Sequence, residues 1–283
     1  MALTLLLLLI LVALIFEFIN GFHDTANSIA TVVATKVLSP TQAVMLAAGM
    51  NLIGAMMGEA VAKTISSGLI DSSVVVITSS VLVCALLAAI VWNLVTWWWG
   101  LPSSSSHALI GGLCGAAIAA ANGNFSALIW AQPADPWYKG GGLLYKVVVP
   151  MLVSPVAGFM LGVIIMGVLF AIIAAMSRSG GRLARIARPR WMNAIFGKLQ
   201  LVSASYMGFA HGLNDAQKTM GIIALALIGA QTVGTLDNLP PVLEFLRPDT
   251  SADAGIAMWI KVTCALVSGR RNSSTGGRLS SVP

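Results

Sequence analysis

The sequence predicts an all-α polytopic membrane protein, and composition and pattern both lead to this fold class. Hydrophobic residues make up 57% of the chain and charged residues only 9%, whereas about a quarter of the residues in an ordinary soluble domain are charged. Apolar runs near the roughly 20 residues that cross a bilayer as a helix recur along most of the length. In lipid every backbone polar group needs an internal partner, and no alternating β-barrel pattern is visible, so these runs are expected to be helices.

Seven apolar segments are expected to form membrane helices, the last one incomplete. They cover residues 2–19, 41–62, 74–99, 107–121, 147–176, 199–230 and 255–267. We accordingly expect a first transmembrane repeat at 1–176, a basic cytoplasmic loop at 177–198, the start of a second repeat at 199–267 and an atypical polar tail at 268–283.

The formal net charge of +6 is concentrated in the basic loop. Its basic residues are Arg178, Arg182, Arg185, Arg188, Arg190 and Lys198. An excess of Lys and Arg is typical of a cytoplasmic loop, so we expect a solvated linker that sets orientation and no nucleic-acid partner. The three cysteines stand singly in apolar stretches without metal or redox spacing, and we expect no cofactor.

Two short polar motifs resemble each other and predict an internal repeat. Residues 21–24 read Gly-Phe-His-Asp and residues 212–215 read Gly-Leu-Asn-Asp, each between apolar stretches. Such pairs are typical of transporters with inverted repeats and helices broken in mid-membrane.

A third polar motif, at residues 100–107, combines Pro102 with four serines and His107. Pro and Ser are helix-start signals, and the motif directly follows a long apolar segment. We therefore expect a serine-rich hairpin or broken helix inside the membrane. A short extramembrane turn with solvated serines is the alternative.

All three histidines of the chain, His23, His107 and His211, fall in these motifs, and Asp24 and Asp215 lie beside two of them. An ionisable group inside a bilayer costs about 2.5–3.5 kcal/mol even on the lenient insertion scale, so the clustering predicts an intramembrane site. The histidines are expected to titrate protons or contact a metal.

The expected ligand is an oxyanion, because serine hydroxyls and a helix N-terminus together form an anion cradle. Ionised Asp24 and Asp215 would repel most anions, but phosphate carries O–H groups that a carboxylate accepts, whereas sulfate near neutral pH has none. The aspartates could equally coordinate sodium or a metal bound with phosphate, and which metal is unknown.

Several residues near the motifs are secondary candidates. Asn27 and Asn214 offer neutral contacts, and Lys218 offers a cation, with snorkelling to an interface as the alternative for Lys218. Glu17 lies two turns before Asp24 on roughly the same face, either as a site residue or as a buried carboxyl that stays protonated.

Three runs resemble the signature elements of the PiT family of inorganic phosphate transporters. Residues 21–27 resemble the first signature, Gly-Ala-Asn-Asp-x-x-Asn, in its bacterial Gly-Phe-His-Asp form. Residues 101–107 resemble the Pro-x-Ser-Ser-x-His element, and residues 211–218 resemble the bacterial second signature. The resemblance extends over about residues 5–267.

The resemblance implies a secondary active transporter rather than an enzyme, which takes up inorganic phosphate across the cell (inner) membrane as a multi-pass protein. It implies that Asp24, Asn27 and Asp215 contact ligand or cation and that residues 104–106 hold phosphate. These three are Ser104, Ser105 and Ser106. The bacterial motif form favours a proton or a neutral metal-phosphate complex over sodium as the coupling cation. Membrane lipid and, left open, a homodimer are the other expected partners.

The chain departs from the family pattern at two points. Lys218 stands where the general signature has its second Asn, so two-fold symmetry of the contacts is in doubt. The second serine/threonine-rich hairpin, expected after about residue 270, is absent, so the second repeat is incomplete. We therefore expect this chain alone to transport poorly.

Three alternatives stay open at this point. A sulfate or other oxyanion transporter of the same family would share the motifs. A hydrolase could draw on Ser105, His107 and Asp24, although no Gly-x-Ser-x-Gly elbow accompanies the serine. A non-transporting membrane fragment is the third reading.

Overall fold

The structure is a computed structural model that describes residues 2–58, 62, 69–71, 73–101, 103–136, 140–248 and 255–279. Within helices, the side chains of residues 22–28, 182, 183, 186 and 269–279 lie outside this description. The chain divides into two compact units, Met1–Trp130 with Ala204–Pro283, and Ala131–Ser203. Among the described residues the extended pairings are two isolated bridges, so the predicted all-α fold is confirmed.

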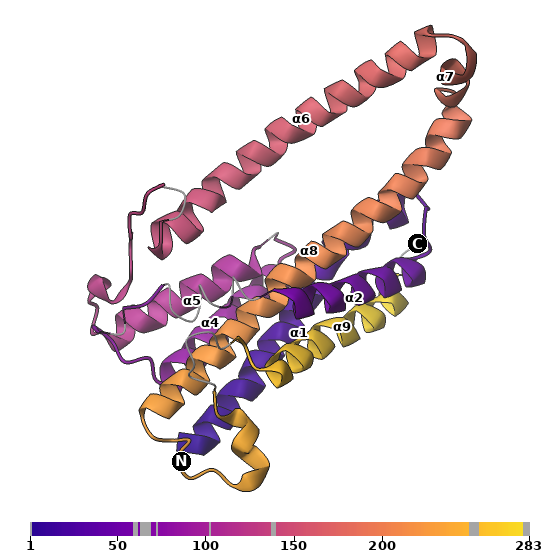
Figure 1. Cartoon of the computed structure of the whole chain (residues 1–283). Coiled ribbons are helices and arrows are strands. Elements are labelled where there is room, and N and C mark those ends of the chain that lie inside the picture. The colour runs from indigo at the N-terminus through magenta and orange to yellow at the C-terminus, as the bar shows by residue number, and fades with distance from the viewer. Residues whose placement is uncertain are drawn as a thin grey trace. The chain divides into compact units, whose positions relative to one another are not determined.

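The first unit is a bundle of long helices (Figure 1). Its elements are α1 (Ala2–Ala34), α2 (Pro40–Met57), α4 (Ser79–Trp98), α5 (Ser105–Ala120), the short 3-10 helices η1 (Phe125–Ala127) and η4 (Pro241–Leu246), the later part of α8 (Pro189–Thr232), and α9 (Met258–Leu279). α2 packs along α9 and α4 packs along α5, while α1 contacts α4, α9 and α2. α4 and α5 thus form a helical hairpin at the serine-rich motif, and its place inside the membrane stays a prediction.

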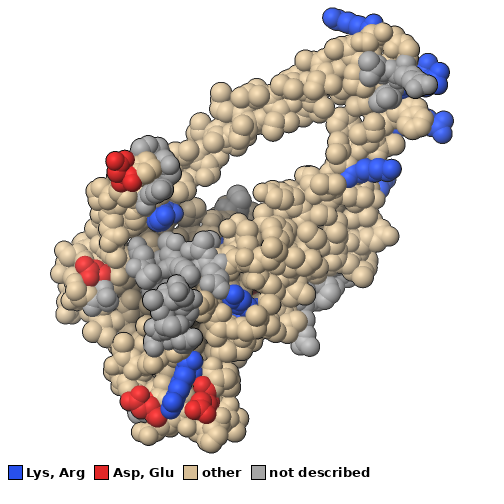
Figure 2. All heavy atoms as spheres, viewed as in Figure 1, with Lys and Arg blue, Asp and Glu red and all other residues tan. Residues whose placement is uncertain are grey.

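The second unit contains a π-helical turn, η3 (Leu144–Val148), which runs into α6 (Val149–Arg178). α7 (Gly181–Ile186) and the first part of α8 follow. Basic side chains gather around α7, as Figure 2 shows. The exposed ones are Arg178, Arg185, Arg188, Arg190 and Lys198. Their exposure agrees with a solvated basic loop.

Three long helices of the first unit, α2, α4 and α5, begin where the sequence supplies side-chain caps. Ser39 forms a capping box with Gln42, and Thr78 accepts a hydrogen bond from the backbone N–H of Val81 at 3.5 Å. Ser104 accepts from the backbone N–H of His107 at 3.4 Å. Each hydroxyl satisfies one of the N–H groups that a helix start leaves without an intrahelical partner, which fixes these boundaries.

Within the described residues, three helices are long and apolar enough to cross a membrane: Ala2–Gly21, Ser79–Trp98 and Leu144–Arg178. Ser105–Ala120 and Met258–Ser268 are shorter apolar helices. The expected segment at 74–99 loses its first residues, because the helix begins only after the Thr78 cap.

The structure differs from the expected break at the two repeated motifs. α1 runs through residues 21–27 and α8 runs through residues 211–218 without interruption. Neither stretch contains Pro, and a Gly inside a helix costs only about 1 kcal/mol relative to Ala. The backbone therefore keeps its helical hydrogen bonds, and polar side chains can project from the helix flank.

Close backbone contact between α2 and α8 depends on glycine. A Cβ at Gly54 would collide with the carbonyl oxygen of Phe209, and a Cβ at Gly212 would collide with the carbonyl oxygen of Asn51. Small residues at such crossings let membrane helices approach closely, where packing replaces the hydrophobic driving force.

We expect Gly54→Ala to lower the thermal unfolding midpoint of the protein in detergent. The added methyl group meets backbone atoms that cannot rotate away, and overpacking of this kind costs about 1–3 kcal/mol. Gly49→Ala is the matched control on the same helix, because a Cβ at Gly49 has nothing within 4 Å. Equal midpoints for the two variants would contradict the close approach of α2 and α8.

Candidate functional site

The first unit contains a set of buried polar side chains on its long helices. They are Glu17, Asn20, Asn51, Asn93, Thr96, Ser105, Asp215, Gln217, Lys218, Thr219 and Ser268. Burying a polar group costs free energy unless it is hydrogen-bonded, and burying a charge costs more unless it is paired. Such a concentration inside the helix bundle of a membrane protein marks a functional region by default.

The charged centre of this set lies on one face of α8. The Lys218 Nζ is 2.5 Å from Asp215 Oδ1, and His211 Nδ1 is 2.9 Å from Asp215 Oδ2. The residues are three and four apart, which places them on adjacent turns of the same helical face. The Asp215 carboxylate is therefore held between an ammonium and an imidazole.

Ser105 connects this centre to the serine-rich hairpin. The Lys218 Nζ donates a hydrogen bond to Ser105 Oγ at 3.3 Å, in a buried environment. Ser105 is the first residue of α5 and only 2% exposed. An ammonium, a hydroxyl and the N-terminal turn of a helix thus meet at one point, and a carboxylate lies beside them.

The other candidates of the hairpin are less buried. Ser104 and His107 are exposed and Ser106 is half-buried. Ser104 and His107 line a groove of about 820 Å³ along α4 and α5, together with Ser103 and Trp92. The Trp92 Nε1 donates to Ser103 Oγ at 3.0 Å.

The remaining predicted residues fall into two groups. Asn214 is exposed, and its amide donates to the backbone carbonyl of Ala210 at 2.8 Å. His23, Asp24 and Asn27 lie in α1, but their side chains are outside the described residues. The meeting of Asp24 with Asp215 stays a prediction.

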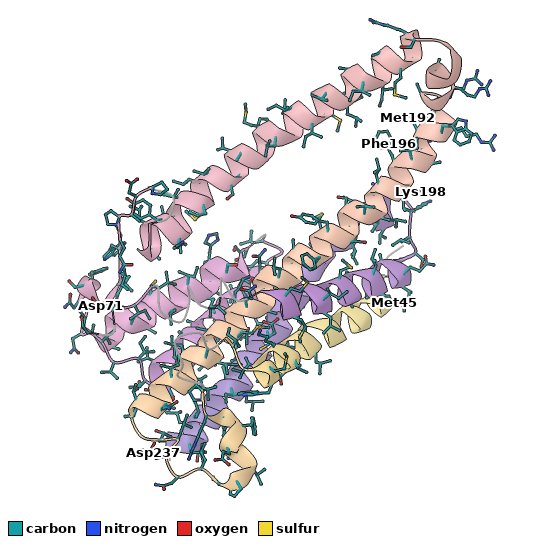
Figure 3. All side chains as sticks on the ribbon, in the orientation of Figure 1. Met45, Asp71, Met192, Phe196, Lys198 and Asp237 are labelled. Carbon is teal, nitrogen blue, oxygen red and sulfur yellow. The ribbon has the colours of Figure 1, made fainter. Side chains whose placement is uncertain are left out.

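Two acidic residues that belong to no motif lie in connecting loops of the first unit, as Figure 3 shows for Asp71 and Asp237. Asp71 accepts hydrogen bonds from the backbone N–H and hydroxyl of Ser73 at 2.9 and 2.6 Å, which lower its pKa. The carboxylate of Asp71 is satisfied locally, so it is a turn residue.

The structure adds polar contacts that motif reasoning did not find. Thr219 Oγ1 donates to Glu17 Oε2 at 2.6 Å, and Asn51 Nδ2 donates to Ser268 Oγ at 2.9 Å. Asn20 and Asn93 are also buried, and their amide groups have no hydrogen-bond partner among the described residues. The available signal was an amide or hydroxyl inside an apolar run, which is too common to single out a residue.

The described part of the chain holds no group of three or more His, Cys, Asp and Glu side chains placed to bind a metal ion. Ser105 is buried against Lys218 while His107 is exposed. Residues two apart on a helix do not face each other. The hairpin therefore gives the hydrolase reading no support.

The family comparison settles the class of protein. A model described as the phosphate transporter family matches residues 20–269, which include all three motifs. The chain belongs to the phosphate transporter family. The predicted resemblance is confirmed.

Individual relatives point the same way. A probable low-affinity inorganic phosphate transporter of Bacillus subtilis is 40% identical over 239 residues, covering 84% of this chain and 65% of the relative. One from Streptomyces halstedii is 43% identical over 213 residues, covering 75% of this chain and 88% of the relative. This chain spans about half to two thirds of several of its relatives, including the mycobacterial ones.

A solved structure supports the fold. It is described as the sodium-dependent phosphate transporter, and it matches 98% of this chain and 76% of its own length with a TM-score of 0.69. Sequence identity is 19%, so this likeness concerns the fold alone.

We expect Lys218→Gln to destabilise the folded protein by about 3–5 kcal/mol, because it leaves the buried Asp215 carboxylate without its ammonium partner. Lys198→Gln is the control, since Lys198 is exposed on α8 (Figure 3). The unfolding midpoint in detergent measures both, and the double variant Asp215→Asn/Lys218→Gln should recover part of the loss. A midpoint for Lys218→Gln equal to that of Lys198→Gln would contradict a buried ion pair.

Proposed function

We propose that the chain is the phosphate-binding part of a secondary transporter that moves inorganic phosphate across the cell membrane together with a cation. The single observation that carries this proposal is the buried contact of Lys218 with both Asp215 and Ser105. Family membership supports the substrate class.

The chemistry of this contact suits phosphate. The N-terminal turn of α5 presents backbone N–H groups and hydroxyls, which bind anions together with the partial positive charge of a helix start. The Lys218 ammonium supplies a full positive charge. Asp215 can accept an O–H of a protonated phosphate, which a fully ionised sulfate does not offer.

The expected site also includes Asp24 and Asn27 of the first motif and Asn214 of the second. In the proposed site, Ser104 and Ser106 turn to the anion beside Ser105, and the histidines of the three motifs lie close enough to exchange protons. The basic loop around α7 faces the cytoplasm of a multi-pass inner-membrane protein, in keeping with the excess of exposed arginine there.

The coupling cation is proposed to be a proton, or a metal that travels with phosphate, rather than sodium. Lys218 already places a cation against Asp215, so this carboxylate does not need a sodium ion for neutralisation. A sulfate transporter of the same family is the second candidate, and the carboxylate at the site argues against it.

Phosphate binding to the purified protein in nanodiscs tests the proposal. We expect Asp215→Asn and Ser105→Ala each to weaken binding of labelled phosphate about 5- to 150-fold, because one loses an acceptor for the phosphate O–H and the other loses a buried donor, each worth about 1–3 kcal/mol. Asp237→Asn is the control, since Asp237 lies in an exposed loop.

Excess unlabelled sulfate distinguishes the two candidate substrates in the same assay. Little displacement of labelled phosphate is expected. Displacement by sulfate equal to that by unlabelled phosphate, or unchanged binding in Asp215→Asn, would overturn the assignment of phosphate to this site.

A further inference from the structure

A second carboxyl group lies deep in the first unit, outside the contact of Lys218 with Asp215 and Ser105. Glu17 of α1 is 0% exposed. Its Oε2 accepts the Thr219 hydroxyl at 2.6 Å, while its Oε1 has no hydrogen-bond partner among the described residues. A buried oxygen without a hydrogen-bond partner destabilises the folded protein, so the arrangement needs an explanation.

Asn20 lies one helical turn after Glu17, on the same face of α1. It is 1% exposed, and neither its amide oxygen nor its amide nitrogen has a partner in the described part of the chain. Side chains three apart on a helix are neighbours. α1 therefore carries a carboxyl oxygen and a complete amide one turn apart on the same face, both buried and both without a hydrogen-bond partner among the described residues.

The amide of Asn93 has the same character. It lies on α4, which packs against α1, and it is 1% exposed with both amide atoms unpartnered among the described residues. Unsatisfied buried amides are rare in native proteins, and two on contacting helices indicate unused polar groups within the packing of α1 and α4.

Burial of Glu17 and the charges around it act together on its protonation. From α8 the groups in electrostatic range are His211, Asp215 and Lys218, and from α9 it is the Cys264 thiol. α4 offers only Cys84 as a titratable residue and α2 offers none. His23 and Asp24 share α1 with Glu17, but their side chains lie outside the description.

None of the described cations contacts Glu17, because Lys218 is engaged by Asp215 and Ser105. An ionised Glu17 would add a negative charge, without a bonded cation, to an interior that already holds Asp215. A protonated Glu17 is neutral, and the Asn20 carbonyl, one helical turn away and without a partner among the described residues, is available to accept its Oε1–H. The surrounding charge and the available hydrogen bond thus both favour the protonated form of Glu17.

We propose that Glu17, with Thr219 as donor and Asn20 as acceptor, is a proton-binding site that takes up a proton when phosphate binds. The proton comes from solvent, bonds to Oε1 and leaves again as phosphate departs. Two consecutive residues connect the proton site to the proposed phosphate site: Lys218 contacts Ser105, and Thr219 contacts Glu17. The coupling rests on the proposed function, whereas the proton site stands on the geometry around Glu17.

A proton suits this site better than sodium. A hard metal cation prefers several oxygen ligands, and the Thr219 hydroxyl already donates toward Glu17. A proton needs only one oxygen to hold it and one acceptor to receive its hydrogen bond.

Infrared spectroscopy of the purified protein tests the proton site without phosphate. At weakly acidic pH, where the site holds its proton without phosphate, we expect a carbonyl stretch of a protonated carboxylic acid that Glu17→Gln removes and Glu244→Gln leaves intact, because Glu244 is exposed. Thr219→Val should shift this band to higher frequency by removing the hydrogen bond to Oε2, which provides a second signature should Glu17→Gln fold poorly. A spectrum without the band, or a band that survives Glu17→Gln, overturns the proposal.

Phosphate affinity measured from weakly acidic to weakly alkaline pH tests the coupling. Phosphate itself changes protonation over this pH range, equally for all variants. The test therefore compares the pH dependence of phosphate affinity between variants. A unit charge on the order of 10 Å away, at an effective dielectric constant near 20, changes affinity about tenfold. As the pH rises, the phosphate affinity of the wild-type and Glu244→Gln proteins should fall about ten times further than the phosphate affinity of Glu17→Gln.

The remaining outcomes separate the hypotheses. Parallel pH profiles for wild type and Glu17→Gln would overturn the coupling. Stabilisation by sodium but not potassium chloride, lost in Glu17→Gln, would show a sodium site instead of a proton site. Absence of phosphate binding in the wild type would remove the proposed function and the coupling, while the infrared band would still decide the proton site.

Discussion

The buried contact between the Lys218 ammonium and the Asp215 carboxylate is the interaction on which the site depends. Two charges in the interior of a helix bundle are tolerated only when they are paired, and breaking such a pair costs more than the pair itself contributes. The same ammonium reaches Ser105 on α5. The contact between Lys218 and Ser105 joins α8 to α5, so it fixes which face of α8 meets the start of the hairpin.

The composition of the chain and the free-energy cost of burying charged groups explain what the sequence could predict. Solvent alone dictates helices in a chain so poor in charge, and the serine-rich motif predicts the start of α5, which Ser104 caps. Asp215 and Lys218 stood out because a charge in an apolar run is expensive. Asn51 did not, because a neutral amide costs less and its partner Ser268 is 217 residues away in the sequence. Contacts of that kind depend on packing, which no local pattern encodes.

The uninterrupted course of α8 has a similarly specific cause. A run that contains Gly212 and several polar residues resembles a break in the membrane. In the structure its polar side chains find partners on their own helix: Asn214 bonds the carbonyl of Ala210, Gln217 bonds the carbonyl of Leu213, and His211 and Lys218 hold Asp215. Because these side chains find their partners on the surface of α8, the backbone hydrogen bonds of the helix remain intact.

Lys218 and Thr219 are consecutive residues, and successive side chains on an α-helix point about 100° apart around its axis. One therefore reaches α5 while the other reaches α1, and a single turn of α8 contacts both Ser105 and Glu17. Charge added at one contact acts on the other through a short path of low dielectric, where Coulomb energies are several times larger than in water. In the proposed cycle, binding of an anion and binding of a proton thus favour each other by electrostatics alone. Movement of the helices is then needed only to expose the bound anion and the bound proton to one side of the membrane or the other.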